Sequence, residues 1–130
     1  MGDRLRARNE YPDLILTSPA LRARCTAELF ANACGYSPEM IVEEAELYFS
    51  STRSIEGIIV NQDDRYRSLM LVFHNPDITQ LVNSIDAAIR IDNIPTCGMV
   101  KLVSDIDRWR DWSVSNTRFE YFDTPKRISV

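Results

Sequence analysis

Two short runs of apolar residues constrain the fold of this chain more than any other feature of its sequence. They are LILT at 14–17 and SLMLVF at 68–73, and neither alternates regularly between apolar and polar side chains. Strands of this kind need cover on both faces, so the runs predict buried strands of a parallel sheet. Each run is followed by a capping residue and a proline, SP at 18–19 and HNP at 74–76, which predicts a helix start.

The rest of the sequence continues this alternation and predicts an α/β fold, a three-layer sandwich around a mostly parallel sheet. Helices are expected at about 19–34, 51–61 and 76–85, and further strands at 40–42, 98–103, 108–114 and 117–122, the last two as a hairpin. The first helix is supported by apolar residues at four-residue spacing and by a glycine at its end: Leu21, Cys25, Leu29, Ala33 and Gly35. The C-terminal part is richer in strands, and we expect it to pair antiparallel at an edge of the sheet.

Length and composition place the chain among globular domains. With 130 residues it is expected to form a single domain over residues 1–130. The net charge of −4 argues against a general nucleic-acid binder, although Arg4, Arg6 and Arg8 form a small basic cluster. No run is apolar enough to span a bilayer and the N-terminus lacks a signal-peptide core, so no membrane association and a cytoplasmic location are expected.

The three cysteines do not indicate a site. Cys25, Cys34 and Cys97 contain no CxxC pair, so neither a disulfide framework nor a zinc site is predicted. A cysteine phosphatase needs an arginine six residues after its cysteine, and the residues at those positions are Ala31, Met40 and Val103. No metal and no other cofactor is expected.

The two predicted strand-to-helix joints point to an anion site. In a parallel sheet both joints lie at the carboxyl edge, where helix N-termini present free N–H groups. Arg22 lies one helical turn after Ser18, and His74, the only histidine, follows the second strand. A guanidinium, an imidazole and helix amides together would suit a phosphate. The structural alternative is that His74 only caps a helix or binds a carbonyl, and that Arg22 is solvated.

Several stretches resemble the histidine phosphatase superfamily, and most closely its SixA-type phosphohistidine phosphatases. DLILTSPALRARCTAELF at 13–30 is similar to the second motif of the superfamily, and VFHNP at 72–76 is similar to its GHNP motif. Other matches follow in order: Leu47-Tyr48, PTCG at 95–98, Trp109 and FDTPKR at 122–127. The resemblance covers nearly all of the chain from Tyr11 onward.

The resemblance implies a phosphoglycerate mutase-like fold and a phosphatase that works without a metal. The substrate implied is phosphohistidine in a phosphoprotein, or a small phosphoester. By this resemblance Arg22 contacts the phosphoryl group, His74 contacts its oxygens and stabilises charge, and Asn75 joins them as a phosphate-binding residue. Ser18 is then an N-cap and Thr26 a packed helix position. Glu43, Glu44 and Glu46 lie where a general acid is expected, without a clear candidate among them.

The sequence departs from the family in two places. The family's nucleophile is a histidine in an Arg-His-Gly or Arg-His-Ala motif that ends the first strand, and no such motif is present. Phe73 also replaces the glycine before His74. We therefore expect a domain that is incomplete at its N-terminus, weakly active or inactive as given, and either unstable, dimeric or with its sheet closed differently. The alternatives are a non-catalytic phosphate-binding or interaction module, or an inactive remnant.

Overall fold

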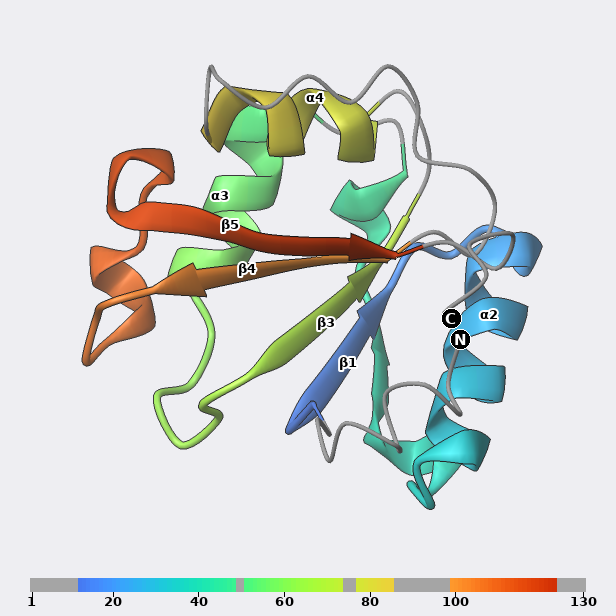
Figure 1. Ribbon diagram of the computed structural model, residues 1–130. Coiled ribbons are helices and arrows are strands. Elements are labelled where there is room, and N and C mark those ends of the chain that lie inside the picture. Colours follow the sequence, from blue (N-terminus) through green and yellow to red (C-terminus); the bar gives the residue numbers. More distant parts are fainter. Residues whose placement is uncertain (1–11, 49–50, 74–76, 86–98, 124–130) are drawn as a thin grey trace, which may run out of the picture.

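The computed structural model describes residues 12–48, 51–73, 77–85 and 99–123. These residues form five strands and three α-helices, joined in part by short 3-10 turns. Three of the strands build a parallel sheet with helices on both sides, and the other two form a separate ribbon (Figure 1). The predicted α/β class and its mostly parallel sheet are therefore confirmed.

The central strand of the parallel sheet is β1 (Leu14–Thr17), which lies between β2 (Ile41–Glu43) and β3 (Leu69–Val72). It pairs with β3 over its whole length, from Leu14 opposite Leu69 to Thr17 opposite Val72. All four residues of β1 are buried. This agrees with the prediction from LILT, because a central strand covered on both faces has no position for a solvated side chain.

Side chains of β1 alternate between two cores, which gives the three layers. On one face Leu14 and Leu16 pack with residues of α3 (Thr52–Val60) and α4 (Asp77–Ile85). We call this group the large core cluster; its buried members are Leu14, Leu16, Leu47, Ile55, Ile58, Ile59, Leu81 and Trp112. On the other face Ile15 packs against Ala27 and Ala31 of α2 (Leu21–Ala33), which forms the small core cluster.

The C-terminal strands form a hairpin that differs from the predicted one. Strand β4 (Met99–Ser104) pairs antiparallel with β5 (Thr117–Asp123), with a register irregularity after Lys101. The strand predicted at 108–114 is wrong, since this segment contains two 3-10 turns, Trp109–Asp111 and Val114–Asn116. Within the described residues the hairpin is a sheet of its own and does not extend the parallel sheet.

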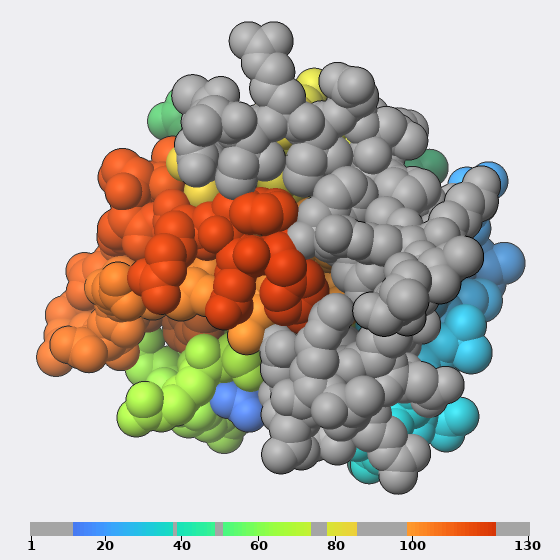
Figure 2. Space-filling model, viewed as in Figure 1, coloured from blue at the N-terminus to red at the C-terminus, as the bar shows by residue number. Residues whose placement is uncertain are grey.

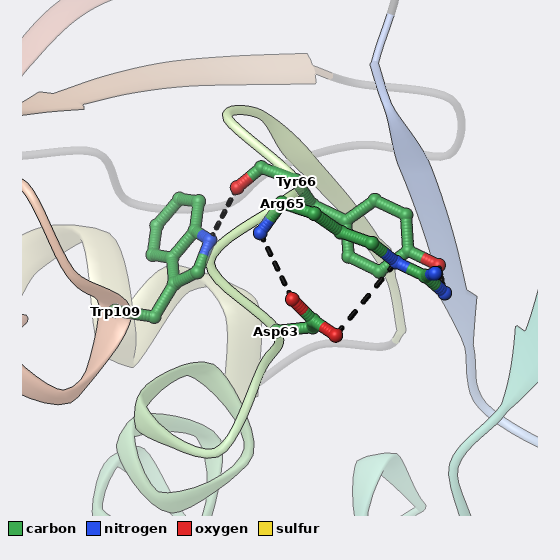
Figure 3. A network of polar contacts seen from close by, with 4 residues as sticks. All are labelled: Asp63, Arg65, Tyr66 and Trp109. Carbon is green, nitrogen blue, oxygen red and sulfur yellow. Dashed lines mark hydrogen bonds and ion pairs between the residues drawn. The ribbon is translucent and has the colours of Figure 1, made fainter.

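Tertiary contacts of two tryptophans explain why 108–114 is not a strand. The Trp109 indole N–H donates to the backbone carbonyl of Tyr66 at 2.6 Å (Figure 3), and the Trp109 backbone N–H donates to the Asp64 carboxylate at 2.9 Å. Trp112 is buried in the large core cluster. The segment is therefore fixed by side chains that reach the parallel-sheet unit, and not by backbone pairing.

The loop that receives Trp109 has polar contacts of its own. The Arg65 backbone N–H donates to the Asp63 carboxylate at 2.9 Å, and the Arg65 guanidinium donates to the Tyr66 hydroxyl at 2.7 Å (Figure 3). The hydrogen bond to Tyr66, together with the charges of Tyr66 and Asp63, raises the pKa of Arg65 above its ordinary value. These contacts lie in the loop that leads into β3.

Helix α2 packs against the sheet through small residues. Its buried residues are Ala23, Ala27, Phe30 and Ala31. The leucines that supported the helix in the sequence lie outside, with Leu21 75% exposed and Leu29 67% exposed. The outer side of α2 forms part of the molecular surface at the right of Figure 2. Alanine side chains allow the helix to approach the sheet closely, so volume and not hydrophobicity selects the buried face.

This assignment of the α2 faces predicts an unusual pair of mutational effects. Ala27→Leu adds three carbon atoms where Ala27 is fully buried against the sheet, and should cost about 1–3 kcal/mol of unfolding free energy. Leu29→Ala removes exposed atoms and should change it by less than about 0.5 kcal/mol. Urea unfolding of both variants measures the difference. A larger loss for Leu29→Ala than for Ala27→Leu would show that the faces are assigned incorrectly.

The Trp109 contact predicts a specific loss of stability. Trp109→Phe keeps an aromatic ring but leaves the Tyr66 carbonyl without its indole donor, which should cost about 1–3 kcal/mol. Arg110→Gln changes the exposed neighbouring residue and should cost less than about 0.5 kcal/mol. Both values follow from chemical denaturation. Equal stability of Trp109→Phe and the parent protein would contradict a structural role for the indole N–H.

Candidate functional site

The exits of the parallel strands meet at one edge of the sheet. Ser18, the residue after β1, donates its backbone N–H to the carbonyl of Val72, the last residue of β3, at 2.8 Å. Glu44, the residue after β2, donates its N–H to the carbonyl of Thr17 at 2.8 Å. The arrowheads of β1 and β3 lie at the same end of the sheet in Figure 1. The predicted meeting of the two strand-to-helix joints is thus present in their described residues.

The turn between β1 and α2 differs in detail from the prediction. Ser18 is completely buried, and its hydroxyl accepts a hydrogen bond from the Ala20 N–H at 3.3 Å. The N-cap of α2 is Ala20, and α2 begins at Leu21. The predictions that Ser18 is the N-cap and Pro19 the first helical residue are therefore wrong. The Ser18 N–H bonds to the Val72 carbonyl, and the helix begins three residues later, at Leu21.

Among the described residues, no side chain caps the start of α2. Ala20 makes no side-chain cap hydrogen bond, and the first turn of α2 contains no acidic residue. The first N–H groups of a helix have no intrahelical partner, and they carry partial positive charge. Those of α2 lie at the carboxyl edge of the sheet, next to the exit of β3. An oxyanion is the ligand that such an arrangement favours.

Arg22 and Arg24 lie on opposite flanks of α2. Two positions along an α-helix correspond to a rotation of about 200°. Arg24 points to the β2 side, where its guanidinium forms an ion pair with Glu43 at 3.7 Å. Arg22 is therefore directed to the other flank, the side on which β3 ends. It is exposed, and within the described part of the chain it makes no ion pair.

The exit of β3 is described as far as Phe73. Its side chain is half-buried and packs against the large core cluster, on the face opposite α2. Val72 points to the α2 face and packs against the small core cluster. His74 and Asn75 lie outside the described residues. Their convergence with Arg22 on one phosphoryl group consequently remains a prediction.

Two hydroxyl groups of this region donate to backbone carbonyls. The Thr26 hydroxyl donates to the Arg22 carbonyl at 3.0 Å within α2. The buried Thr17 hydroxyl donates to the Ser18 carbonyl at 3.0 Å, a contact that no local signal in the sequence announced. Of the acidic residues considered as a general acid, Glu43 is paired with Arg24, and Glu46 is exposed.

Two further properties of the described residues concern metal binding and membrane insertion. Those residues contain no group of three or more histidine, cysteine, aspartate or glutamate side chains placed to hold a metal ion. The described helices also include none long and apolar enough to cross a membrane.

Two solved structures share this architecture. A protein assigned as the phosphohistidine phosphatase SixA of Agrobacterium tumefaciens is 28% identical, with a TM-score of 0.73 over 95% of this chain and 75% of that chain. A protein assigned as the phosphohistidine phosphatase SixA of Nakamurella multipartitia is 16% identical, with a TM-score of 0.77 over 97% of this chain and 78% of that chain. At that identity the second likeness concerns the fold alone. No family model matches the chain, and neither does any curated protein sequence.

The turn after β1 gives a matched pair of threonine variants. Thr17→Val keeps the shape of a buried side chain but removes the donor to the Ser18 carbonyl, and should cost about 1–3 kcal/mol of stability. Thr26→Val removes a hydroxyl from a less buried position on α2 and should cost about 0.5 kcal/mol or less. Thermal and urea unfolding compare the two. If Thr26→Val were the more damaging change, the Thr17 hydroxyl would not be what holds this turn.

Proposed function

We propose that this chain, which has the fold of the SixA-type histidine phosphatases, binds a phosphoryl group at the edge where β1 and β3 end. The observation that carries the proposal is the hydrogen bond from the Ser18 N–H to the Val72 carbonyl. It joins the exits of the two strands that the sequence continues with Arg22 and with His74. Ligands of open α/β sheets bind at such carboxyl edges.

Arg22 supplies the fixed positive charge of the proposed site. It lies in the first turn of α2, where side chains lean back toward the helix N-terminus and so toward the sheet edge. Its neighbour Arg24 is engaged by Glu43, whereas Arg22 has no carboxylate partner within the described residues. A guanidinium presents a planar pair of donors that matches two phosphoryl oxygens.

His74 and Asn75 complete the proposed site from the β3 side. They are the second and third residues after Val72 in the sequence. The protonated imidazole of His74 would donate to a phosphoryl oxygen and stabilise the charge on it, and the Asn75 amide would add a neutral donor. The amides at the start of α2 contribute the remaining positive potential.

The substrate class that we propose is phosphohistidine in a phosphoprotein, in a cytoplasmic setting. Its P–N bond joins the phosphoryl group to an imidazole, which leaves readily once it is protonated. Such a leaving group lowers the need for a dedicated general acid. This agrees with the ion pair that already engages the Glu43 carboxylate. A small phosphoester is the alternative substrate, and its poorer leaving group would need an acid.

A non-catalytic phosphate-binding module is a second candidate, and one observation favours it. The sequence contains a single histidine, His74. Hydrolysis through a phosphohistidine intermediate uses one imidazole as the nucleophile and gains from a second that stabilises charge. With His74 as its only imidazole, the chain as given is better equipped to hold a phosphoryl group than to transfer it.

Phosphate binding tests the proposed site directly. Inorganic phosphate at about 100 times its dissociation constant should stabilise the parent protein by about 2.7 kcal/mol, seen as a raised Tm. Arg22→Ala should weaken binding by roughly 10- to 100-fold, the loss of a charged hydrogen-bonding partner worth about 1.5–3 kcal/mol. Arg24→Ala is the matched control, because it removes a guanidinium of the same helix that is already paired with Glu43.

The outcomes separate the two candidates. Binding that depends on Arg22 but not on Arg24, together with release of phosphate from a phosphohistidine-containing protein in ³¹P NMR spectra, would support the phosphatase. The same binding without release would support the phosphate-binding module. No change in Tm with phosphate or vanadate, or equal losses in Arg22→Ala and Arg24→Ala, would reject the site.

A further inference from the structure

We propose that Phe73 is a positioning residue for the phosphoryl site. Its ring packs against the large core cluster and so fixes the end of β3 beside the end of β1. The consequence for phosphate binding rests on the proposed function, whereas the fixing of the strand end does not. The sequence has an aromatic residue here where the resemblance leads one to expect glycine.

Two successive residues at the end of β3 are fixed by different contacts on different faces. The Val72 carbonyl accepts the hydrogen bond from Ser18, and the Val72 side chain packs against the small core cluster next to α2. Phe73 points to the opposite face and packs against the large core cluster, as Leu69 and Leu71 do. The strand end is consequently held from both layers of helices at once.

An aromatic side chain at this position also lowers the conformational freedom of the chain. Glycine loses more backbone freedom on folding than any other residue, and it has no side chain with which to pack. Phe73 combines a restricted backbone with a half-buried ring. His74 follows Phe73 in the sequence, so a fixed Phe73 fixes the point from which the chain continues to it.

Hydrogen exchange of the Ser18 amide tests the inference without any ligand. This amide reports the contact with Val72 directly, because its N–H donates to the Val72 carbonyl. In Phe73→Ala it should exchange roughly tenfold faster relative to amides of α3, which corresponds to about 1.4 kcal/mol of local stability. Phe73→Leu, which keeps an apolar side chain in the cluster, should restore most of the protection.

Ile55→Val is the control for general destabilisation. Ile55 is fully buried in the same cluster but lies on α3, away from the end of β3. This variant should speed exchange of Ser18 and of the α3 amides alike, and should leave the dissociation constant of inorganic phosphate unchanged. Phe73→Ala should raise that constant by about tenfold even where the protein remains folded, and Phe73→Leu should bring it back toward the parent value.

Each outcome of the exchange and phosphate-binding measurements supports or overturns the inference. Unchanged relative exchange of Ser18 in Phe73→Ala would overturn the inference, whatever the phosphate result. Faster exchange with an unchanged phosphate constant would also overturn it, because the strand end would then not matter to the site. Faster exchange in a protein whose parent binds no phosphate would reject the proposed function and still support Phe73 as the residue that fixes this strand end.

Discussion

The pairing of β1 with β3 is the constraint on which the other features of this molecule depend. At the start of the two strands, the Asp13 carboxylate accepts the Arg67 N–H at 2.8 Å. At their end, the Ser18 N–H donates to the Val72 carbonyl. Because β1 is buried on both faces, it fixes the two cores at once. It also determines where α2 begins, and so where Arg22 projects. A shift of this register by one residue would turn Ile15 away from α2 and move the end of β3 away from Ser18.

The local signals of the sequence were sufficient for the strands and helices that depend on them. The apolar runs predicted β1 and β3, and Gly35 marked the end of α2 correctly, since its φ of 77° lies in the left-handed region. The helix predicted at 51–61 is present as α3, and Ser51 caps it by accepting the Ser54 N–H. Ser18 is also a serine before a helix, but the prediction that it caps α2 was wrong. The difference is that the Ser18 amide belongs to the sheet, a tertiary fact that no capping preference contains.

Other features were decided by contacts between distant parts of the chain. The leucines of α2 suggested a helix but not its buried face, because the close approach of helix and sheet selects Ala27 and Ala31. The segment 108–114 contains apolar residues suited to a strand, yet two of them are tryptophans whose partners lie far away in the sequence. For the site, the sequence predicted that Arg22 lies in the helix that follows β1, and the structure has it in the first turn of α2. The ion pair of Arg24 with Glu43, which distinguishes the two arginines, follows only from the structure.

The number of imidazoles limits what the proposed site can do. A histidine that attacks phosphorus must be neutral, because the lone pair of its nitrogen forms the new bond. A histidine that stabilises the charge on the phosphoryl oxygens acts as an N–H donor, and it does so most strongly when protonated. A single imidazole cannot attack phosphorus and also serve as the charge-stabilising donor for the same substrate. In the proposed site His74 suits the second role, in which a protonated imidazole binds an anion more tightly as the anion becomes more negative. If His74 takes the charge-stabilising role in the proposed site, phosphoryl transfer there needs another nucleophile, whereas the proposed role of Phe73 concerns binding alone.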